Sequence, residues 1–142
     1  MVKHTIKVSK QVSIEDYGDQ VGISIDECSK EILLSLVLLR DRFSEEIKIV
    51  FDNFKLNFLL TEKNNRSFCT LFDIEQGIAT LNISLDSLSY IIKYLLINYR
   101  DGVAEAEHID IDFVTNHDFE VTLTIHSRFY NSFSSEEIFG VK

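Results

Sequence analysis

The amino-acid sequence predicts a single α+β domain in which two main helices pack against an antiparallel β-sheet. Several short segments alternate apolar and polar residues, which is the period of a strand with one buried face. Two longer segments carry apolar residues at helical spacing. The expected order of strands, helix, strands, helix and hairpin is typical of the α+β class. No repeat, linker or low-complexity tract divides residues 1–142, so we expect one domain.

The first expected element is a strand over residues 5–14, whose even positions are apolar. A polar stretch with Gly18 follows it and predicts a turn. Residues 21–25 alternate again, and we therefore expect an N-terminal hairpin.

The next segment predicts a helix from Asp26, a good N-cap residue, to about Phe43. This segment is apolar around most of its circumference, which predicts a central helix covered on more than one side. Residues 47–51 and 54–60 alternate and predict either two strands with a tight turn between them or one bent strand. Residues 68–74 and 78–83 flank a turn sequence that ends in glycine, and they predict a second hairpin.

Residues 85–100 predict the second helix, because their apolar side chains form one continuous face. Ser84 is a suitable N-cap and Gly102 can end the helix. Residues 108–114 and 120–127 predict a final hairpin around a five-residue loop.

Acidic residues concentrate near the C-terminus. Residues 101–142 hold nine acidic and two basic residues, and they account for −7 of the net charge of −9. Seven carboxylates lie between Asp101 and Ser127 without a Lys or Arg among them. A field of one sign accelerates association with an oppositely charged partner and repels nucleic acid. We therefore expect a basic protein partner and no binding to nucleic acid.

The sequence contains none of the motifs of phosphate-binding loops, nucleophile elbows or zinc-protease helices. We therefore expect no catalytic residues, no enzymatic activity and no cofactor. Cys28 and Cys69 lack metal or redox spacing and are expected to be buried free thiols, which suits a cytoplasmic protein. No apolar run reaches the length of a membrane span, and we expect no membrane association.

The final hairpin carries the main alternative. Its five-residue loop would place His108 opposite His126 and Asp110 opposite Thr124 on the outer face. We expect no metal site, but His108, Asp110 and His126 are the candidates if the chain is instead a metal- or small-ligand-binding protein, because two imidazoles and a carboxylate can ligate zinc, nickel or ferrous iron. A solvated acidic face and a partner-binding face are the other interpretations of the same residues.

Two aromatic features leave further alternatives open. Tyr90, Tyr94 and Asn98 form a stripe along the second helix, which either contacts a partner or covers the edge of the sheet. Residues 129–142 include five large apolar side chains, which suggests docking onto the body of the protein or onto another chain. A homodimer joined through this tail or through edge strands is therefore a further hypothesis.

The stretch SLDSLSYIIKYLLINYRDGVAEAEHIDIDF, residues 84–113, combines an amphipathic helix carrying tyrosines, an acidic loop and a following strand. In this stretch, and in its size and acidity, the chain resembles small immunity proteins of bacterial polymorphic-toxin and contact-dependent inhibition systems. The resemblance is to this class of proteins and covers 30 of 142 residues.

The resemblance implies a cytoplasmic inhibitor without catalysis, which binds a cognate toxin domain, often a cationic nuclease, at or near its active site. Carried to this sequence, it implies an acidic surface that competes with nucleic-acid phosphates, formed by Glu105, Glu107, Asp110 and Asp112. Inside that acidic rim, we expect Tyr94 or Tyr99 to be buried as an aromatic anchor on binding.

Overall fold

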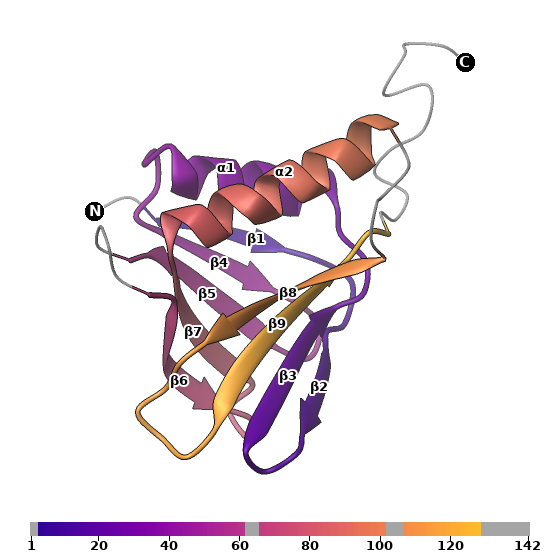
Figure 1. The fold of residues 1–142 in the computed structure, drawn as a ribbon. Coiled ribbons are helices and arrows are strands. Elements are labelled where there is room, and N and C mark those ends of the chain that lie inside the picture. The colour runs from indigo at the N-terminus through magenta and orange to yellow at the C-terminus, as the bar shows by residue number, and fades with distance from the viewer. Residues whose placement is uncertain (1–2, 62–65, 102–106, 129–142) are drawn as a thin grey trace.

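The computed structural model describes residues 3–61, 66–101 and 107–128. Within these residues, two helices and nine strands form a wedge of two facing sheets (Figure 1). The five-stranded sheet has the order β1 (Lys3–Lys7), β4 (Glu46–Val50), β5 (Lys55–Leu60), β7 (Ile78–Ile83) and β6 (Phe68–Asp73). The four-stranded sheet has the order β2 (Ser13–Asp16), β3 (Gln20–Ile25), β9 (Glu120–His126) and β8 (His108–Phe113).

The α+β class and the packing of helices on sheet are confirmed, but the prediction of one antiparallel sheet is wrong. Both sheets are mixed, since β1 runs parallel to β4, β5 to β7, and β3 to β9. The antiparallel neighbours β2–β3, β4–β5, β6–β7 and β8–β9 are the four hairpins of the described residues. A tight turn forces antiparallel pairing, whereas each parallel pair joins segments that are far apart in the sequence.

The predicted first strand over residues 5–14 is also corrected, because its two ends lie in different sheets. Val8 and Val12 are both buried, as the alternation predicts. The Val8 backbone N–H donates to Val50, while the Val12 N–H donates to the side chain of Asn53 at 3.0 Å. The chain therefore leaves the five-stranded sheet and enters the N-terminal hairpin of the four-stranded sheet. That hairpin is confirmed, with Gly18 in the left-handed region at φ 89°.

Helix α1 (Lys30–Arg40) is shorter than predicted, and its N-cap is Ser29, not Asp26. Ser29 has an extended backbone and its hydroxyl accepts from the Ile32 N–H at 3.3 Å. Asp26 lies three residues before this cap, and its carboxylate instead accepts from the Ser13 and Ser24 hydroxyls. As predicted, the helix is apolar around most of its circumference and packs against both α2 and the five-stranded sheet, but its cover is incomplete, since Leu34 is 60% exposed.

Helix α2 (Leu85–Asp101) confirms the second predicted helix. The Ser84 hydroxyl accepts from the Ser87 N–H at 3.2 Å, as expected of an N-cap. The predicted stop at Gly102 lies outside the described residues. Four residues of its apolar face are fully buried: Leu88, Ile91, Ile92 and Leu95.

The core lies between the two sheets and under the helices, which cover the wide end of the wedge (Figure 1). At the opposite end, the ring of Phe72 lies 6.0 Å from that of Phe54 and 6.1 Å from that of Phe119. The sheets also meet along one side, where the Cys69 N–H donates to the Val114 carbonyl at 2.8 Å. This packing uses the inner faces of both sheets. Neither helix is long and apolar enough to cross a membrane.

Candidate functional site

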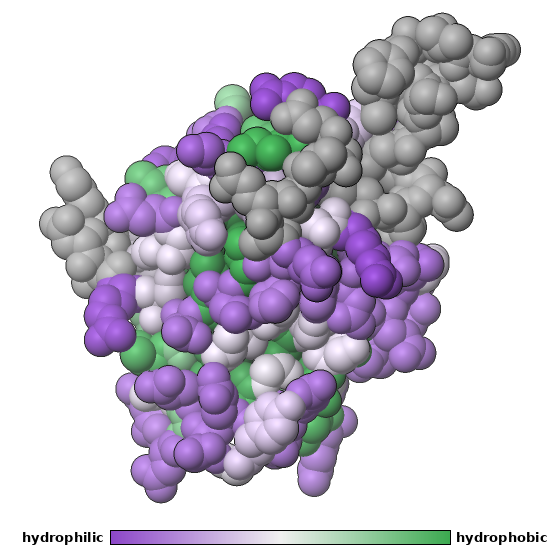
Figure 2. Space-filling view, turned by 45° about the vertical axis from the view of Figure 1, so that its right-hand side comes forward, coloured by the Kyte–Doolittle hydropathy of each residue, from purple (hydrophilic) through white to green (hydrophobic). Residues whose placement is uncertain are grey.

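The outer face of the four-stranded sheet is the candidate site. Residues on alternate positions of β3, β8 and β9 point into the core, so the residues between them point outward. The outward residues, which we call the acidic face, are Ser13, Glu15, Gln20, Gly22, Ser24, Asp26, His108, Asp110, Asp112, Glu120, Thr122, Thr124 and His126. Five of them are carboxylates and none is Lys or Arg. Figure 2, which turns this side of the molecule forward, shows a surface dominated by hydrophilic and near-neutral side chains.

The predicted register of the final hairpin is confirmed. His108 pairs with His126, Asp110 with Thr124, and Asp112 with Thr122. The five-residue loop sets this register, and the buried Ile and Phe side chains on alternate positions hold it, because a slip by one residue would expose all of them.

Threonine hydroxyls on β9 hold two of the carboxylates in place. Thr124 donates to Asp110 Oδ1 at 2.6 Å, and Thr122 donates to Asp112 Oδ1 at 2.9 Å. The Gln20 amide donates in turn to the Thr122 hydroxyl at 2.9 Å, which links three strands. A carboxylate accepts several hydrogen bonds, so both aspartates keep acceptor capacity for a ligand.

A second network lies on the side of β3 and β2. Asp26 accepts from the Ser24 hydroxyl at 2.8 Å and from the Ser13 hydroxyl at 2.7 Å. His126 Nε2 lies 3.1 Å from the Ser24 oxygen and 3.6 Å from Asp26 Oδ1. Because the Ser24 proton is donated to Asp26, the Nε2–H of His126 is the donor to Ser24. The carboxylates therefore flank a central strip of small side chains that includes Gly22.

The metal candidates share this face. The His108 and His126 rings are 5.5 Å apart, and His108 Nε2 lies 3.8 Å from Asp110 Oδ2. His126, however, points its Nε2 toward Ser24. Across residues 3–61, 66–101 and 107–128, no group of three or more His, Cys, Asp or Glu side chains is placed to hold a metal ion.

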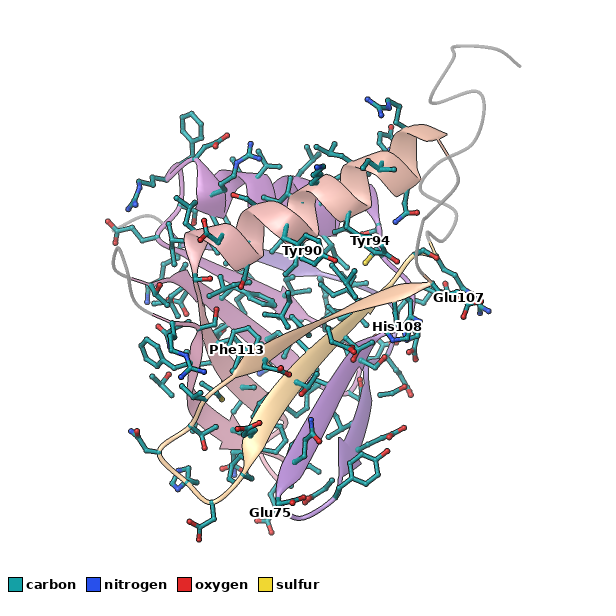
Figure 3. All side chains as sticks on the ribbon, viewed as in Figure 1. Glu75, Tyr90, Tyr94, Glu107, His108 and Phe113 are labelled. Atoms are coloured by element: carbon teal, nitrogen blue, oxygen red, sulfur yellow. The ribbon has the colours of Figure 1, made fainter. Side chains whose placement is uncertain are left out.

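Of the remaining predicted site residues, Glu107 directly precedes β8, and Tyr94 is hydrogen-bonded to Ser127, which pairs with Glu107. Glu105 lies outside the described residues. Glu107 is exposed beside His108, and its carbonyl accepts from the Ser127 N–H at 2.9 Å (Figure 3). Tyr94 is partly buried, and this burial raises the pKa of its hydroxyl, against the opposing effect of hydrogen bonds with Ser127 and Asn98.

The two predicted aromatic anchors both pack against the core. Tyr94 and Tyr99 are partly buried beside it, whereas Tyr90 is 53% exposed. Figure 3 shows Tyr90 and Tyr94 on α2. Tyr90 offers a larger free aromatic surface than either predicted anchor.

Sequence reasoning missed the contribution of the N-terminal hairpin to this face. Glu15, Ser24 and Asp26 join it because β3 pairs in parallel with β9, in the register of Ser24 with Thr124. The alternation of residues 21–25 indicated which side chains would point outward. Nothing local indicated that this strand would lie beside residues about 100 positions later.

Comparison with known proteins adds no relative from which a function could be transferred. No protein-family model, curated protein or solved structure matches the chain. We therefore infer a function from the geometry and the charges of the acidic face.

Proposed function

We propose that this chain is a non-catalytic binding protein that neutralises a basic protein toxin, in the manner of the immunity proteins that it resembles, by docking the toxin on the acidic face. The observation that carries the proposal is the composition of that face. It gathers five carboxylates from three strands and the segment after β3, and it holds no Lys or Arg.

A basic partner would be attracted before contact. The net charge of −9 gives the whole chain the sign that attracts a cation, and the acidic face concentrates carboxylates within one surface. Such complementarity raises association rates by about 10- to 1000-fold, and the effect falls steeply as salt rises. Where the toxin is a nuclease, the carboxylates would occupy the surface that binds phosphates.

The face is also ordered before binding. The Thr122 and Thr124 hydroxyls already orient Asp112 and Asp110, and Asp26 is held by two serines. Side chains that are fixed in advance lose less conformational entropy on binding. The small side chains along the centre of the face leave room for the long Lys and Arg side chains of a partner.

The proposal places the protein in the cytoplasm of a bacterial cell that makes or meets the toxin. It assigns the chain no cofactor and no reaction. Inhibition follows from occupying a surface that the toxin needs, so affinity and slow release are what the acidic face must provide.

The test is affinity capture from the native host with the tagged full chain as bait, followed by co-expression with the captured protein. A bait carrying Asp110→Asn, Asp112→Asn and Glu15→Gln removes three charges from the acidic face. The matched control, Glu45→Gln, Asp52→Asn and Asp86→Asn, removes three exposed carboxylates elsewhere. Asparagine retains an acceptor oxygen for the threonine hydroxyls, so the fold of the test variant is preserved.

We expect one basic protein in stoichiometric amount, released as salt rises, captured by the control and lost from the acidic-face variant. Co-expression of the wild-type chain should rescue growth from the toxicity of that protein. A captured partner that binds the acidic-face variant as well as the wild type, or that is not toxic, would contradict the proposal.

A further inference from the structure

Three turns meet at the narrow end of the wedge and enclose a second feature that the acidic face does not include. They are the turn between β2 and β3, the turn between β6 and β7, and the loop between β8 and β9. Between them lies an open hollow of about 340 Å³, which we call the turn-end hollow. Figure 3 shows Glu75 at this end, close to the β2–β3 turn.

The floor of the turn-end hollow is apolar. It consists of Val21, Phe72, Ile74 and Phe119. Ile74 is 53% exposed, so it adds accessible apolar surface to the hollow. The rings of Phe72 and Phe119 meet edge to face at 66°, so their positions are fixed by packing on each other.

The rim of the hollow is acidic. Asp16, Asp73 and Glu75 line it, and no Lys or Arg does. Asp16 Oδ1 accepts from the Gly18 N–H at 2.8 Å, and Asp73 Oδ1 accepts from the Gln76 N–H at 3.0 Å. These bonds orient the two carboxylates and leave the second oxygen of each without a hydrogen-bond partner in the described part of the chain. Lys55 lies two strands away from Asp73 in the register of the five-stranded sheet.

We propose that the turn-end hollow binds an arginine side chain of the basic protein partner. The apolar floor takes the aliphatic stem, and the three rim carboxylates take the guanidinium group. Arginine fits this combination better than lysine, because its five N–H donors form a planar fork that can bond several carboxylate oxygens at once. A neutral apolar side chain would leave the rim unpaired, and an acidic one would be repelled.

The inference rests on the proposed function and deepens it, because it names the group of the partner that the interface anchors. The hollow adjoins one end of the acidic face: Glu120 donates its N–H to the Asp19 carbonyl, and Phe119 precedes Glu120 directly. One basic surface could therefore cover the acidic face and place an arginine in the hollow. Arginine side chains are enriched among the residues that contribute most of the binding energy of protein interfaces.

The first experiment needs no partner. The full chain, labelled on its methyl groups, is titrated with N-acetyl-arginine amide at constant ionic strength and followed by NMR. N-acetyl-citrulline amide is the matched probe, because it has the same shape without the charge. N-acetyl-lysine amide tests the choice between the two cations.

We expect saturable shifts of the Val21 and Ile74 methyl signals with a Kd of about 10 mM or below, a weak affinity appropriate to one side chain. The wild-type chain should bind citrulline amide at least about tenfold more weakly than the arginine probe. The variant Asp73→Asn, Glu75→Gln should bind the arginine probe at least about tenfold more weakly than the wild type does. The variant Glu45→Gln, Asp52→Asn should bind as the wild type does. Equal shifts with citrulline amide, equal affinity for the lysine probe, or arginine shifts confined to the acidic face would overturn the assignment.

The second experiment separates this inference from the proposed function. If the arginine probe binds in the hollow but no basic toxin is captured from the host, arginine binding by the hollow is supported and the proposed function is contradicted. If a basic toxin is captured and its affinity for the Asp73→Asn, Glu75→Gln variant equals that for the wild type, the hollow is not part of the interface. That result contradicts the arginine assignment and leaves the proposed function supported.

Discussion

The two sheets are built alike on the inside and differently on the outside. Each contains hairpins joined by parallel pairs, and each buries alternate residues in the same core. The strands of the four-stranded sheet carry five acidic residues and no Lys or Arg. The strands of the five-stranded sheet carry four lysines, Lys3, Lys7, Lys48 and Lys55, and two acidic residues, Glu46 and Asp73.

This difference in outer-face charge indicates that the fold does not require either sign of charge there. Folding constrains the inner residues, because apolar burial provides most of the stabilisation. Lys3 of the five-stranded sheet pairs with Glu46 at 3.0 Å, as opposite charges on a solvated sheet commonly do. The acidic face has no such cationic partner within its own sheet. Carboxylates that lie on one surface without a basic neighbour favour the binding of a cationic partner. We therefore assign the binding function to the acidic face.

The largest expected effect tests whether the inner faces are equivalent. Phe58 in β5 and Phe113 in β8 are both almost fully buried. We expect Phe58→Ala and Phe113→Ala each to lower the free energy of unfolding by about 3–5 kcal/mol, because both leave a cavity in one shared core. Denaturant titration measures this, with Leu34→Ala on the exposed side of α1 as a control that should change little. A loss below 1 kcal/mol for only one of the two phenylalanines would show that the sheets do not share a core.

The next effect concerns the outer faces and uses the partner captured from the host. Neutralising Asp110, Asp112 and Glu120 should slow association at low salt by about tenfold or more, because the steering field is weakened. Neutralising Lys3, Lys48 and Lys55 on the other sheet should leave the rate unchanged or raise it. Stopped-flow measurements of the association rate at low and at high salt distinguish the two triple variants. Equal slowing by both triple variants would remove the functional distinction between the sheets.

A smaller effect on stability comes from two glycines that differ in backbone conformation. Gly77, in the β6–β7 turn, has φ 67°, and an added Cβ would lie 3.3 Å from the Asn53 carbonyl oxygen. Gly22, on the acidic face, has ordinary backbone, and an added Cβ would meet only atoms of Glu15 at 3.9 Å or more. We expect Gly77→Ala to destabilise the protein by about 1–2 kcal/mol.

The matched change Gly22→Ala should be neutral or stabilising by up to about 1 kcal/mol, because alanine restricts the unfolded chain more than glycine does. Thermal unfolding of the two variants side by side is the measurement. Destabilisation at Gly22 as large as that at Gly77 would mean that the centre of the acidic face is more closely packed than its geometry indicates.

The smallest effect concerns the two thiols. Burial raises the pKa of Cys28 to about 12 and that of Cys69 to about 11. A raised pKa in the folded state means that folding excludes the thiolate. The free energy of unfolding is therefore unaffected by the thiols below the thiol pKa of the unfolded chain, about 8.5. It falls as pH rises from there toward 11 and 12, because only the unfolded chain then gains thiolates.

We expect both thiols to resist iodoacetamide at pH 8 in the folded protein and to react in denaturant. Cys69 should react first, because it lies on the edge strand β6, whereas Cys28 lies at the start of α1 with no exposed surface. Mass spectrometry of the alkylated peptides gives both rates. Fast native labelling of Cys28 would contradict its burial.

The local pattern of the sequence determined most elements and their faces. Three of the four hairpins, α2 with its Ser84 cap and the pairing of His108 with His126 follow from periodicity and turn length over fewer than 20 residues, whereas the pattern of residues 47–60 left one bent strand open as an alternative. These are short-range effects, because a strand alternates its side chains and a tight turn fixes the register of its two strands. The cysteines were predicted to be buried on composition alone and are buried.

Only the tertiary structure decided how these elements were combined. Parallel pairing of β3 with β9 brings Glu15 and Asp26 onto the same sheet face as Asp110, and the division of residues 5–14 between two sheets makes this possible. In the same assembly the cap of α1 is Ser29, while Asp26 accepts from Ser13 and Ser24. A single segment carries no trace of such choices, because parallel pairing depends on which distant strand completes a shared core and not on any turn between them.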